Sequence, residues 1–290
     1  MQEITVLGSK DYEVTGKNYG DCFIINTGTE LYLYDCGSVE HAKRVLDYMN
    51  KKGYDKVTII LSHNDSDHFD GIPYLWEQGV IDRIYTVLLL KYSKEIQNLI
   101  NDGRRSKDGI KEAIKNKYDN INELSGYPLY DIYEDGHDLC DEIEIVGPDK
   151  EDMLETVARD LDPRESDTTF GETNVNATSI HLEINMFNRK ILLCGDAPFE
   201  RIENIVSDYD AVQLPHHGKA SIADEIFKKM NYNVQVRYIV SDNTGNSNGG
   251  SDDLKREGHL ISNTKDMGDI DIDASFFASS RIRTRETLGI

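Results

Sequence analysis

Short apolar runs alternate with amphipathic segments along the first third of the chain, and this pattern predicts alternating strands and helices. Two apolar runs within residues 22–36 flank a glycine-containing turn and predict a β-hairpin. Residues 40–52 carry apolar side chains at helical spacing and end before a glycine, which predicts a capped helix. A fully apolar strand is expected at residues 57–61, and a helix and a strand follow near 72–79 and 80–90.

The rest of the chain continues this alternation around one segment of different composition. Residues 91–125 are rich in Lys, Asn and Asp, and their apolar positions recur at helical spacing, which predicts a helical insertion. Residues 242–253 are polar and glycine-rich, as is typical of a loop. The other predicted strands lie at 139–146, 179–194, 259–262, 268–273 and 275–278, and the other predicted helices at 151–160, 198–206 and 221–229. The whole pattern predicts an α/β fold of paired mixed sheets covered by helices, in a single domain over residues 1–290.

The charge balance limits the partners that the protein can bind. Acidic residues outnumber basic ones 53 to 32, and the formal net charge is −21. Such a surface repels phosphate backbones at long range, which argues against a protein that coats nucleic acid non-specifically. It does not exclude a nuclease, because bound divalent ions reverse the local potential.

The cysteines and the apolar runs bear on the cellular environment. The four cysteines form no CxxC pair, and each lies in or near an apolar run, so we expect buried, reduced thiols. No run reaches the 18 apolar residues of a membrane span, and residues 1–7 lack the features of a signal peptide. We therefore expect a protein of the reducing cytoplasm that does not bind membranes.

Four potential metal ligands lie within six positions, directly after the apolar strand at 57–61. They are His63, Asp65, Asp67 and His68. The chain has only eight histidines, so two that bracket two alternating aspartates are improbable by composition. Imidazole and carboxylate together suit zinc, manganese or iron. Several carboxylates fit two ions that share a bridging ligand better than they fit one ion.

Two further apolar strands end in residues of the same kinds. Residues 191–194 lead into Asp196, and residues 211–214 lead into His216 and His217. Taken alone, a Gly-Asp pair after a strand is usually a turn, and a His-His pair is usually structural. Three strand ends that offer His or Asp in one chain nevertheless indicate a single metal site.

These residues resemble the HxHxDH signature of the metallo-β-lactamase superfamily, with Asp65 in the second histidine position. The flanking segments resemble the hydrolase domain of the competence protein ComEC and its soluble relatives. Those segments are Gly20-Asp21, Tyr34-Asp35-Cys36-Gly37, Asn176 with Ser179, Leu193-Cys194-Gly195-Asp196 and His216-His217-Gly218. The resemblance implies a metallo-β-lactamase-like αββα four-layer sandwich, with residues 91–125 as a helical insertion.

The resemblance also implies a ligand set for two divalent ions, either zinc or manganese, with magnesium as a further candidate. His63 and Asp65 would hold the first ion, and Asp196 would bridge the two. The second ion would be held by Asp67, His68 and His216, although the sequence does not distinguish whether His216 or His217 is the ligand.

Other residues receive supporting or catalytic roles from the same resemblance. Asp35 would be a buried carboxylate that positions the His-Asp loop, and Ser179 would support the ligands with it. Asp67 would also orient the nucleophile, and His217 would contact the substrate as a proton donor.

One departure from the superfamily concerns the first ion. Many members supply a third histidine upstream of the bridging aspartate, but residues 172–176 contain none. His181 lies inside an apolar strand and is expected to be structural. The first ion is therefore expected to be held weakly, which favours manganese or magnesium.

The favoured function is a phosphodiesterase or nuclease that acts on DNA, RNA or a nucleotide-like substrate. Two close cations lower the pKa of a bridging water and supply hydroxide. Arg104 and Arg105 belong to a local concentration of basic residues in the insertion and are expected to contact phosphates. The alternative for these arginines is an ordinary solvated helical face.

Two other functional classes remain open at this stage. The same hydroxide would serve a hydrolase of a thioester, lactone or lactam. A third reading is a non-catalytic, metal-stabilised component of a bacterial defence or competence complex, which would bind a partner protein.

Overall fold

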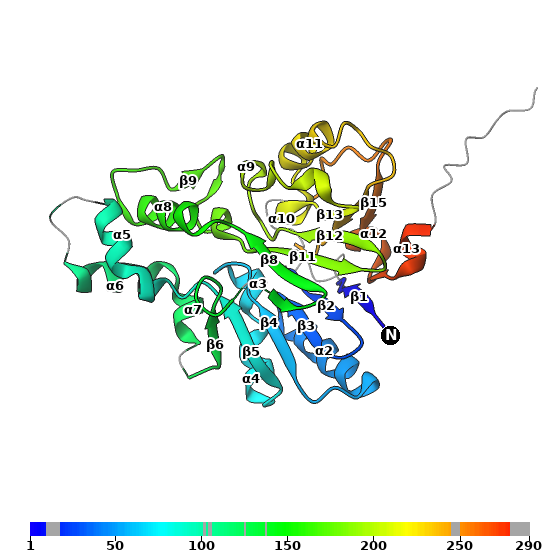
Figure 1. The fold of residues 1–290 in the computed structure, drawn as a ribbon, viewed down its shortest axis with the longest axis horizontal. Coiled ribbons are helices and arrows are strands. Elements are labelled where there is room, and N and C mark those ends of the chain that lie inside the picture. The colour runs from blue at the N-terminus through cyan, green and yellow to red at the C-terminus, as the bar shows by residue number, and fades with distance from the viewer. Residues whose placement is uncertain are drawn as a thin grey trace, which may run out of the picture.

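The computed structural model describes residues 1–9, 18–100, 103, 106–124, 126–136, 138–244 and 250–278. Two seven-stranded sheets lie face to face in this part of the chain, and helices cover their outer faces (Figure 1). The first sheet has the order β16-β1-β2-β3-β4-β5-β6, and the second has the order β15-β14-β13-β12-β11-β8-β7. The predicted four-layer α/β sandwich is confirmed.

Each sheet is antiparallel in one half and parallel in the other. Strands pair in parallel from β3 to β6 in the first sheet and from β12 to β15 in the second. The first sheet contains β1 (Glu3–Val6), β2 (Phe23–Asn26), β3 (Leu31–Tyr34), β4 (Val57–Ile60), β5 (Ile81–Thr86), β6 (Leu129–Asp131) and β16 (Ile270–Ile272). The second contains β7 (Asp138–Cys140), β8 (Ile143–Gly147), β11 (His181–Met186), β12 (Arg189–Leu193), β13 (Ala211–Gln213), β14 (Arg237–Val240) and β15 (Leu260–Asn263). A small separate hairpin is formed by β9 (Thr168–Thr169) and β10 (Glu172–Thr173).

The helix α2 (Val39–Lys52) has a capping residue at each end. It begins after Ser38, whose hydroxyl accepts a hydrogen bond from the His41 amide at 3.2 Å, and it ends at the expected Gly53, with φ of 81°. The longer helices are α2 (Val39–Lys52), α4 (Ile72–Glu77), α5 (Ser93–Ile100), α6 (Lys107–Lys117), α7 (Asp119–Glu123), α8 (Lys150–Leu161) and α11 (Ala220–Lys229). Single turns are α3 (Ser66–Phe69), α9 (Phe199–Ile202), α10 (Pro215–Gly218), α12 (Thr264–Met267), α13 (Ala274–Ala278), η1 (Leu89–Tyr92), η2 (Asn176–Thr178) and η3 (Val206–Asp208).

Three apolar clusters hold the four layers together. The central cluster lies between the sheets and joins side chains such as Phe23 and Leu182. A second lies under α2 and α4 and includes Val45, and a third lies under α9 and α11 and includes Ile226. Burying each large aliphatic side chain stabilises the fold by roughly 1.5–3 kcal/mol. All four residues of β4 are buried because the strand lies between two of these clusters.

The described residues of the segment 91–125 form η1, α5, α6 and α7, so they are helical as predicted, and they extend the central cluster. Side chains of α5 and α6 such as Ile96 and Ile114 belong to the same cluster as the inter-sheet residues, and they contact α8. Tyr118, at the end of α6, donates a hydrogen bond to Asp160 Oδ2 of α8 at 3.1 Å. The two arginines assigned to substrate binding, Arg104 and Arg105, lie outside the described residues.

The predicted elements differ from the structure mainly near the C-terminus. The strand expected at 275–278 is instead the helix α13, because Asp273 accepts hydrogen bonds from the amides of Ser275 and Phe276 at 2.7 and 3.1 Å. This is helix capping, which a short apolar run does not reveal by its periodicity. The helix expected at 198–206 is also shorter and ends at Ile202.

The cysteines agree with the expectation of buried, reduced thiols. Cys22, Cys36 and Cys194 are buried and Cys140 is partly buried, and all four are free thiols. Among the described residues, no helix has both the length and the apolar character needed to cross a membrane.

Candidate metal centre

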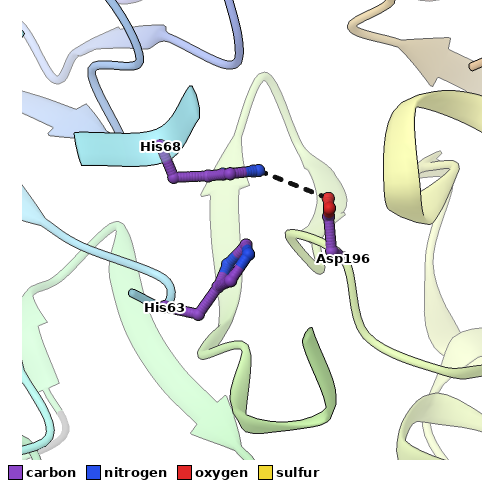
Figure 2. Close-up of side chains that lie close together, drawn as sticks. All are labelled: His63, His68 and Asp196. Atoms are coloured by element: carbon purple, nitrogen blue, oxygen red, sulfur yellow. Dashed lines mark ion pairs between the residues drawn. The ribbon is translucent and has the colours of Figure 1, made fainter. Parts of the chain in front are cut away.

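Side chains from both sheets converge where strands β4 and β12 end (Figure 2). His63 follows β4 and His68 lies on the single turn α3, whereas Asp196 follows β12 of the other sheet. His68 Nε2 lies 3.5 Å from Asp196 Oδ1, and the ring of His63 points toward both. The centre therefore spans the two halves of the sandwich.

Three overlapping groups of side chains place their ligand atoms within 4.8 Å of one another. The groups are His63-His68-Asp196, Asp67-His68-His217 and Asp21-Asp196-His217. Because they share His68, Asp196 and His217, they form one continuous set. The structure thus brings together five of the residues predicted from sequence and adds Asp21.

The imidazoles of this set are oriented by hydrogen bonds at Nδ1. His68 Nδ1 lies 2.7 Å from Asp35 Oδ2, and His63 Nδ1 lies 2.9 Å from Ser62 Oγ and 3.3 Å from Ser179 Oγ. With Nδ1 occupied as a donor, each ring presents the lone pair of Nε2 to the centre. Asp35 and Ser179 therefore lie where the resemblance placed supporting residues.

Asp35 also fixes the start of the ligand loop. Its two carboxylate oxygens accept hydrogen bonds from the amide and the hydroxyl of Ser62, each at 2.7 Å. Asp35 is fully buried and has a left-handed φ of 61° at the end of β3. One carboxylate thus ties the loop after β4 to the loop after β3.

Asp21 supports His217 in the same way. His217 Nδ1 lies 3.1 Å from Asp21 Oδ1 and 3.0 Å from the carbonyl oxygen of Ser241. The other Asp21 oxygen accepts a hydrogen bond from Gln213 Nε2 at 3.2 Å. Gln213 Oε1 in turn accepts a hydrogen bond from the amide of Gly195 at 3.1 Å. The Gln213 side chain therefore connects Asp21, the partner of His217, to the loop that carries Asp196.

The two adjacent histidines occupy different positions, and both have left-handed backbones with φ of 52° and 54°. His217 Nε2 lies 3.2 Å from Asp67 Oδ2 and belongs to the group that contains His68. His216 Nε2 lies 3.9 Å from Asp196 Oδ2, and its side chain is 22% exposed. Of the two, His217 therefore lies with Asp67 and His68, in the place that the resemblance gave to His216.

His216 has its own carboxylate partner. Its Nδ1 lies 2.7 Å from Oε2 of the buried Glu172, and the other Glu172 oxygen forms an ion pair with Lys219. Glu172 thus holds an imidazole and an ammonium group side by side at the rim of the centre.

Asp65 lies at the edge of the centre. Its Oδ2 is 3.6 Å from His63 Nε2, and its side chain is 43% exposed. The structure therefore brings Asp65 next to His63 but outside the three compact groups.

The aspartates and histidines of the centre shift one another's pKa values strongly. Burial alone would raise the pKa of Asp67 and Asp196, but the neighbouring histidines outweigh it and hold both pKa values well below the ordinary range. Burial would lower the pKa of His68 and His217, but Asp196 with Asp35 or Asp21 raises both. The neighbouring imidazoles therefore favour the ionised form of both carboxylates.

Several buried atoms here have no hydrogen-bond partner among the described residues. They are His63 Nε2, His68 Nε2 and Asp196 Oδ1. Leaving buried polar atoms unpaired is costly unless another ligand satisfies them. Imidazole nitrogen and carboxylate oxygen are the donors that divalent transition metals prefer. The residues present therefore fit a metal centre.

The sequence patterns indicated no role for four residues of this region, Asp21, Gln213, Glu172 and Lys219. A signal existed for two of them. Asp21 and Asp35 flank the first hairpin, so its antiparallel pairing brings both aspartates to the same end. Gln213 is a polar residue in an otherwise apolar strand. Glu172 lies in the two-residue strand β10 and Lys219 lies between α10 and α11, where spacing carries no such information.

The comparisons with known proteins place the chain in a family. Residues 15–238 match the family model of the metallo-β-lactamase superfamily. No protein with a curated description matches the chain. The ComEC-like branch within the superfamily stays a prediction.

Several solved structures are similar to this one at low sequence identity. Tm1679, described as a metal-dependent hydrolase of the β-lactamase superfamily, is 14% identical, with a TM-score of 0.49, over 94% of this chain and 99% of its own. YhfI from Bacillus subtilis, a metallo-β-lactamase fold protein, is 12% identical, with a TM-score of 0.46, over 82% of this chain and 85% of its own.

An oxidoreductase is also among the similar structures. Rubredoxin:oxygen oxidoreductase from Desulfovibrio gigas is 12% identical, with a TM-score of 0.36, over 67% of this chain and 39% of its own. Similarity at this level does not identify a substrate. The match of the family model over most of the chain shows that it belongs to the metallo-β-lactamase superfamily of metal-dependent hydrolases.

Proposed function

We propose that this chain is a two-metal hydrolase that cleaves phosphodiesters. The observation that carries the proposal is the convergence of imidazole and carboxylate atoms without hydrogen-bond partners from two strand ends, those of β4 and β12. His63, His68 and Asp196 lie within 4.8 Å of one another through such atoms, and His217 adjoins them. A buried cluster of this kind is expensive unless ions occupy it.

The ligand groups divide between two ions, for which we propose zinc or manganese, with magnesium as the alternative. His63, Asp65 and Asp196 would hold the first. The second would be held by Asp67, His68 and His217, with Asp196 shared. When bound, such ions provide a nucleophile at neutral pH and neutralise developing negative charge.

The protein supplies orientation around this centre. Asp35 and Asp21 accept the Nδ1 protons of His68 and His217, which fixes both rings with Nε2 toward the centre. Asn18 Nδ2 donates to Asp67 Oδ2 at 2.8 Å, which fixes that carboxylate as well. Preorganised groups of this kind need little rearrangement during reaction.

The rim of the centre favours an anionic substrate. His217 occupies a ligand position here, so we assign the contacts with substrate oxygens to His216 and Lys219. Glu172 holds these two donors, and the His216 ring lies beside Asp196. On a chain with a net charge of −21, fixed hydrogen-bond donors next to bound ions are what a phosphodiester needs in order to approach.

A direct comparison of substrates tests the proposal. Purified protein, with its metal content determined by elemental analysis, is assayed on a chromogenic phosphodiester and on thioester, lactone and β-lactam panels. We expect metal-dependent cleavage of the phosphodiester, loss of activity with chelator, and recovery on adding zinc or manganese. Cleavage of lactones, thioesters or lactams alone would show that the substrate is carboxylic.

The finer substrate class is part of the same proposal. By its resemblance to the ComEC hydrolase domain, we propose DNA, RNA or a nucleotide-like molecule as substrate, in a cytoplasmic setting. Digestion of single-stranded and double-stranded DNA, RNA and cyclic dinucleotides distinguishes these. A protein that binds metals but cleaves none of them would instead support a structural role with a partner protein.

A further inference from the structure

Asn64 lies between two proposed metal ligands, and three hydrogen bonds join it to the helix α7. Its Oδ1 accepts the Ile121 amide at 3.0 Å, and its Nδ2 donates to Asp119 Oδ1 at 3.3 Å. The carbonyl oxygen of Asn64 accepts a hydrogen bond from Asn120 Nδ2 at 2.6 Å. These contacts connect the ligand loop to the helical segment 91–125, more than 50 residues away.

The anchor on the α7 side is itself fixed. Ile121 and Leu124 are buried in the cluster under α2 and α4. Asn122 Nδ2 donates to the carbonyl oxygen of Tyr118 at 2.6 Å, which holds α7 to the end of α6. Tyr118 is in turn bonded to Asp160 of α8. The loop is therefore tied to an element that is held from two directions.

The part of the ligand loop that carries Asp65 needs this support more than the part that carries His63. His63 is oriented by Ser62 and Ser179, but Asp65 is 43% exposed, so the backbone around Asn64 sets the position of its carboxylate. The segment 172–176, which lacks a histidine, gives no extra ligand to the first ion. Asn64 itself is only 5% exposed and its polar atoms are satisfied by α7.

We propose that Asn64 is a positioning residue for the first ion, and that the segment 91–125 acts on the metal centre through it. The inference rests on the proposed two-metal site. It assigns the helical segment a role that does not depend on substrate: α7 holds His63 and Asp65 at the spacing that an ion requires. Supporting residues of this kind typically change metal affinity by about 10–100-fold.

Two variants of matched chemistry test the proposal. Asn64→Ala removes the side-chain bonds between the loop and α7. Asn116→Ala makes the same change at an exposed position of α6 and removes no bond between the loop and α7. Zinc and cobalt binding is measured by competition with a chromophoric chelator, and exchange of the amides of residues 62–66 is measured by mass spectrometry in metal-free protein.

In Asn64→Ala, we expect about 10–100-fold weaker binding of one of the two ions and faster amide exchange in the loop. In Asn116→Ala, we expect wild-type metal affinity. Equal losses in both variants, or wild-type binding and exchange in Asn64→Ala, would overturn the inference. If Asn64→Ala does not fold, Asn120→Ala removes only the bond to the Asn64 carbonyl and should shift affinity in the same direction, and an unchanged affinity there would also overturn it.

The controls separate this inference from the proposed function. If the wild-type protein bound no metal, the proposed metal centre itself would be rejected. Wild-type protein that binds two ions and cleaves phosphodiesters, together with an unaffected Asn64→Ala variant, would reject only the role of Asn64.

Discussion

The carboxylate of Asp21 lies 3.1 Å from Nδ1 of His217, although 196 residues separate the two in the chain. Both are buried, and Gln213 holds the second Asp21 oxygen. A carboxylate that accepts the Nδ1 proton of a histidine fixes the ring and makes Nε2 a better ligand. The relationship links the first hairpin of one sheet to the end of β13 in the other.

Replacing Asp21 should weaken the metal centre without removing a ligand from the predicted set. For Asp21→Ala, we expect about 10–100-fold lower metal affinity or activity, because the His217 ring loses its orienting partner. Asp47→Ala, at an exposed position of α2, serves as the control and should behave as wild type. Metal competition titrations measure the effect, and wild-type affinity in Asp21→Ala would show that Ser241 and packing suffice to orient His217.

Divalent ions should stabilise the folded protein through Asp196. A ligand that binds only the native state, at about 100 times its dissociation constant, adds about 2.7 kcal/mol to the free energy of unfolding. We therefore expect zinc or manganese to raise the melting temperature of chelator-treated protein. Asp196→Asn should largely abolish this rise, because the shared carboxylate is lost. An equal rise in the variant would place the ions elsewhere.

Lys219 should matter for anionic substrates only. Its ammonium group is fixed by Glu172 beside His216, so Lys219→Met should raise KM for a phosphodiester chromogen about tenfold, which corresponds to one charge-assisted hydrogen bond. Lys219→Arg keeps the charge and should retain most of the affinity. Steady-state kinetics at low and high salt measure the effect, and an unchanged KM in the methionine variant would remove Lys219 from the substrate site.

Acid should destabilise the fold through two buried histidines that are not members of the ligand groups. Burial lowers the pKa of both His41 and His181 to about 3, from an ordinary value of 6.5. Above pH 6.5 both rings are neutral in the folded and unfolded chains, so they do not affect stability. As the pH falls below 6.5, only the unfolded chain takes up these protons, and stability is lost progressively down to about pH 3.

At about pH 5 this loss amounts to about 2 kcal/mol for each histidine. Urea denaturation at about pH 7.5 and about pH 5 measures it. His41→Phe should make the free energy of unfolding less dependent on pH over this range, and the wild-type dependence in that variant would contradict the assigned pKa.

The fold and most of the centre could be predicted because they depend on patterns that the sequence carries directly. Apolar strands that end in His or Asp place those residues at one edge of paired sheets, which is why His63 and Asp196 meet. The adjacent pair His216 and His217 could not be resolved, because their roles depend on two left-handed backbone conformations. No spacing rule predicts those.

Residues that are positioned by long-range contacts could not be predicted from the sequence either. Glu172 reaches His216 from a two-residue strand of a separate small hairpin, and Asn64 is anchored by a helix 55 residues later. Short elements of this kind have weak local signals, so their placement is decided by tertiary contacts. The C-terminal helix α13 was missed for a related reason, since the capping by Asp273 outweighs its apolar pattern.

The left-handed backbone at His216 and His217 implies a trade-off between thermal stability and activity. For residues other than glycine, this conformation costs roughly 1 kcal/mol or more at each position. Glycine would occupy both positions without that cost, so selection for thermal stability alone would favour replacing the two histidines with glycine. Laboratory evolution toward heat tolerance, without a demand for turnover, should therefore replace these histidines and abolish the activity.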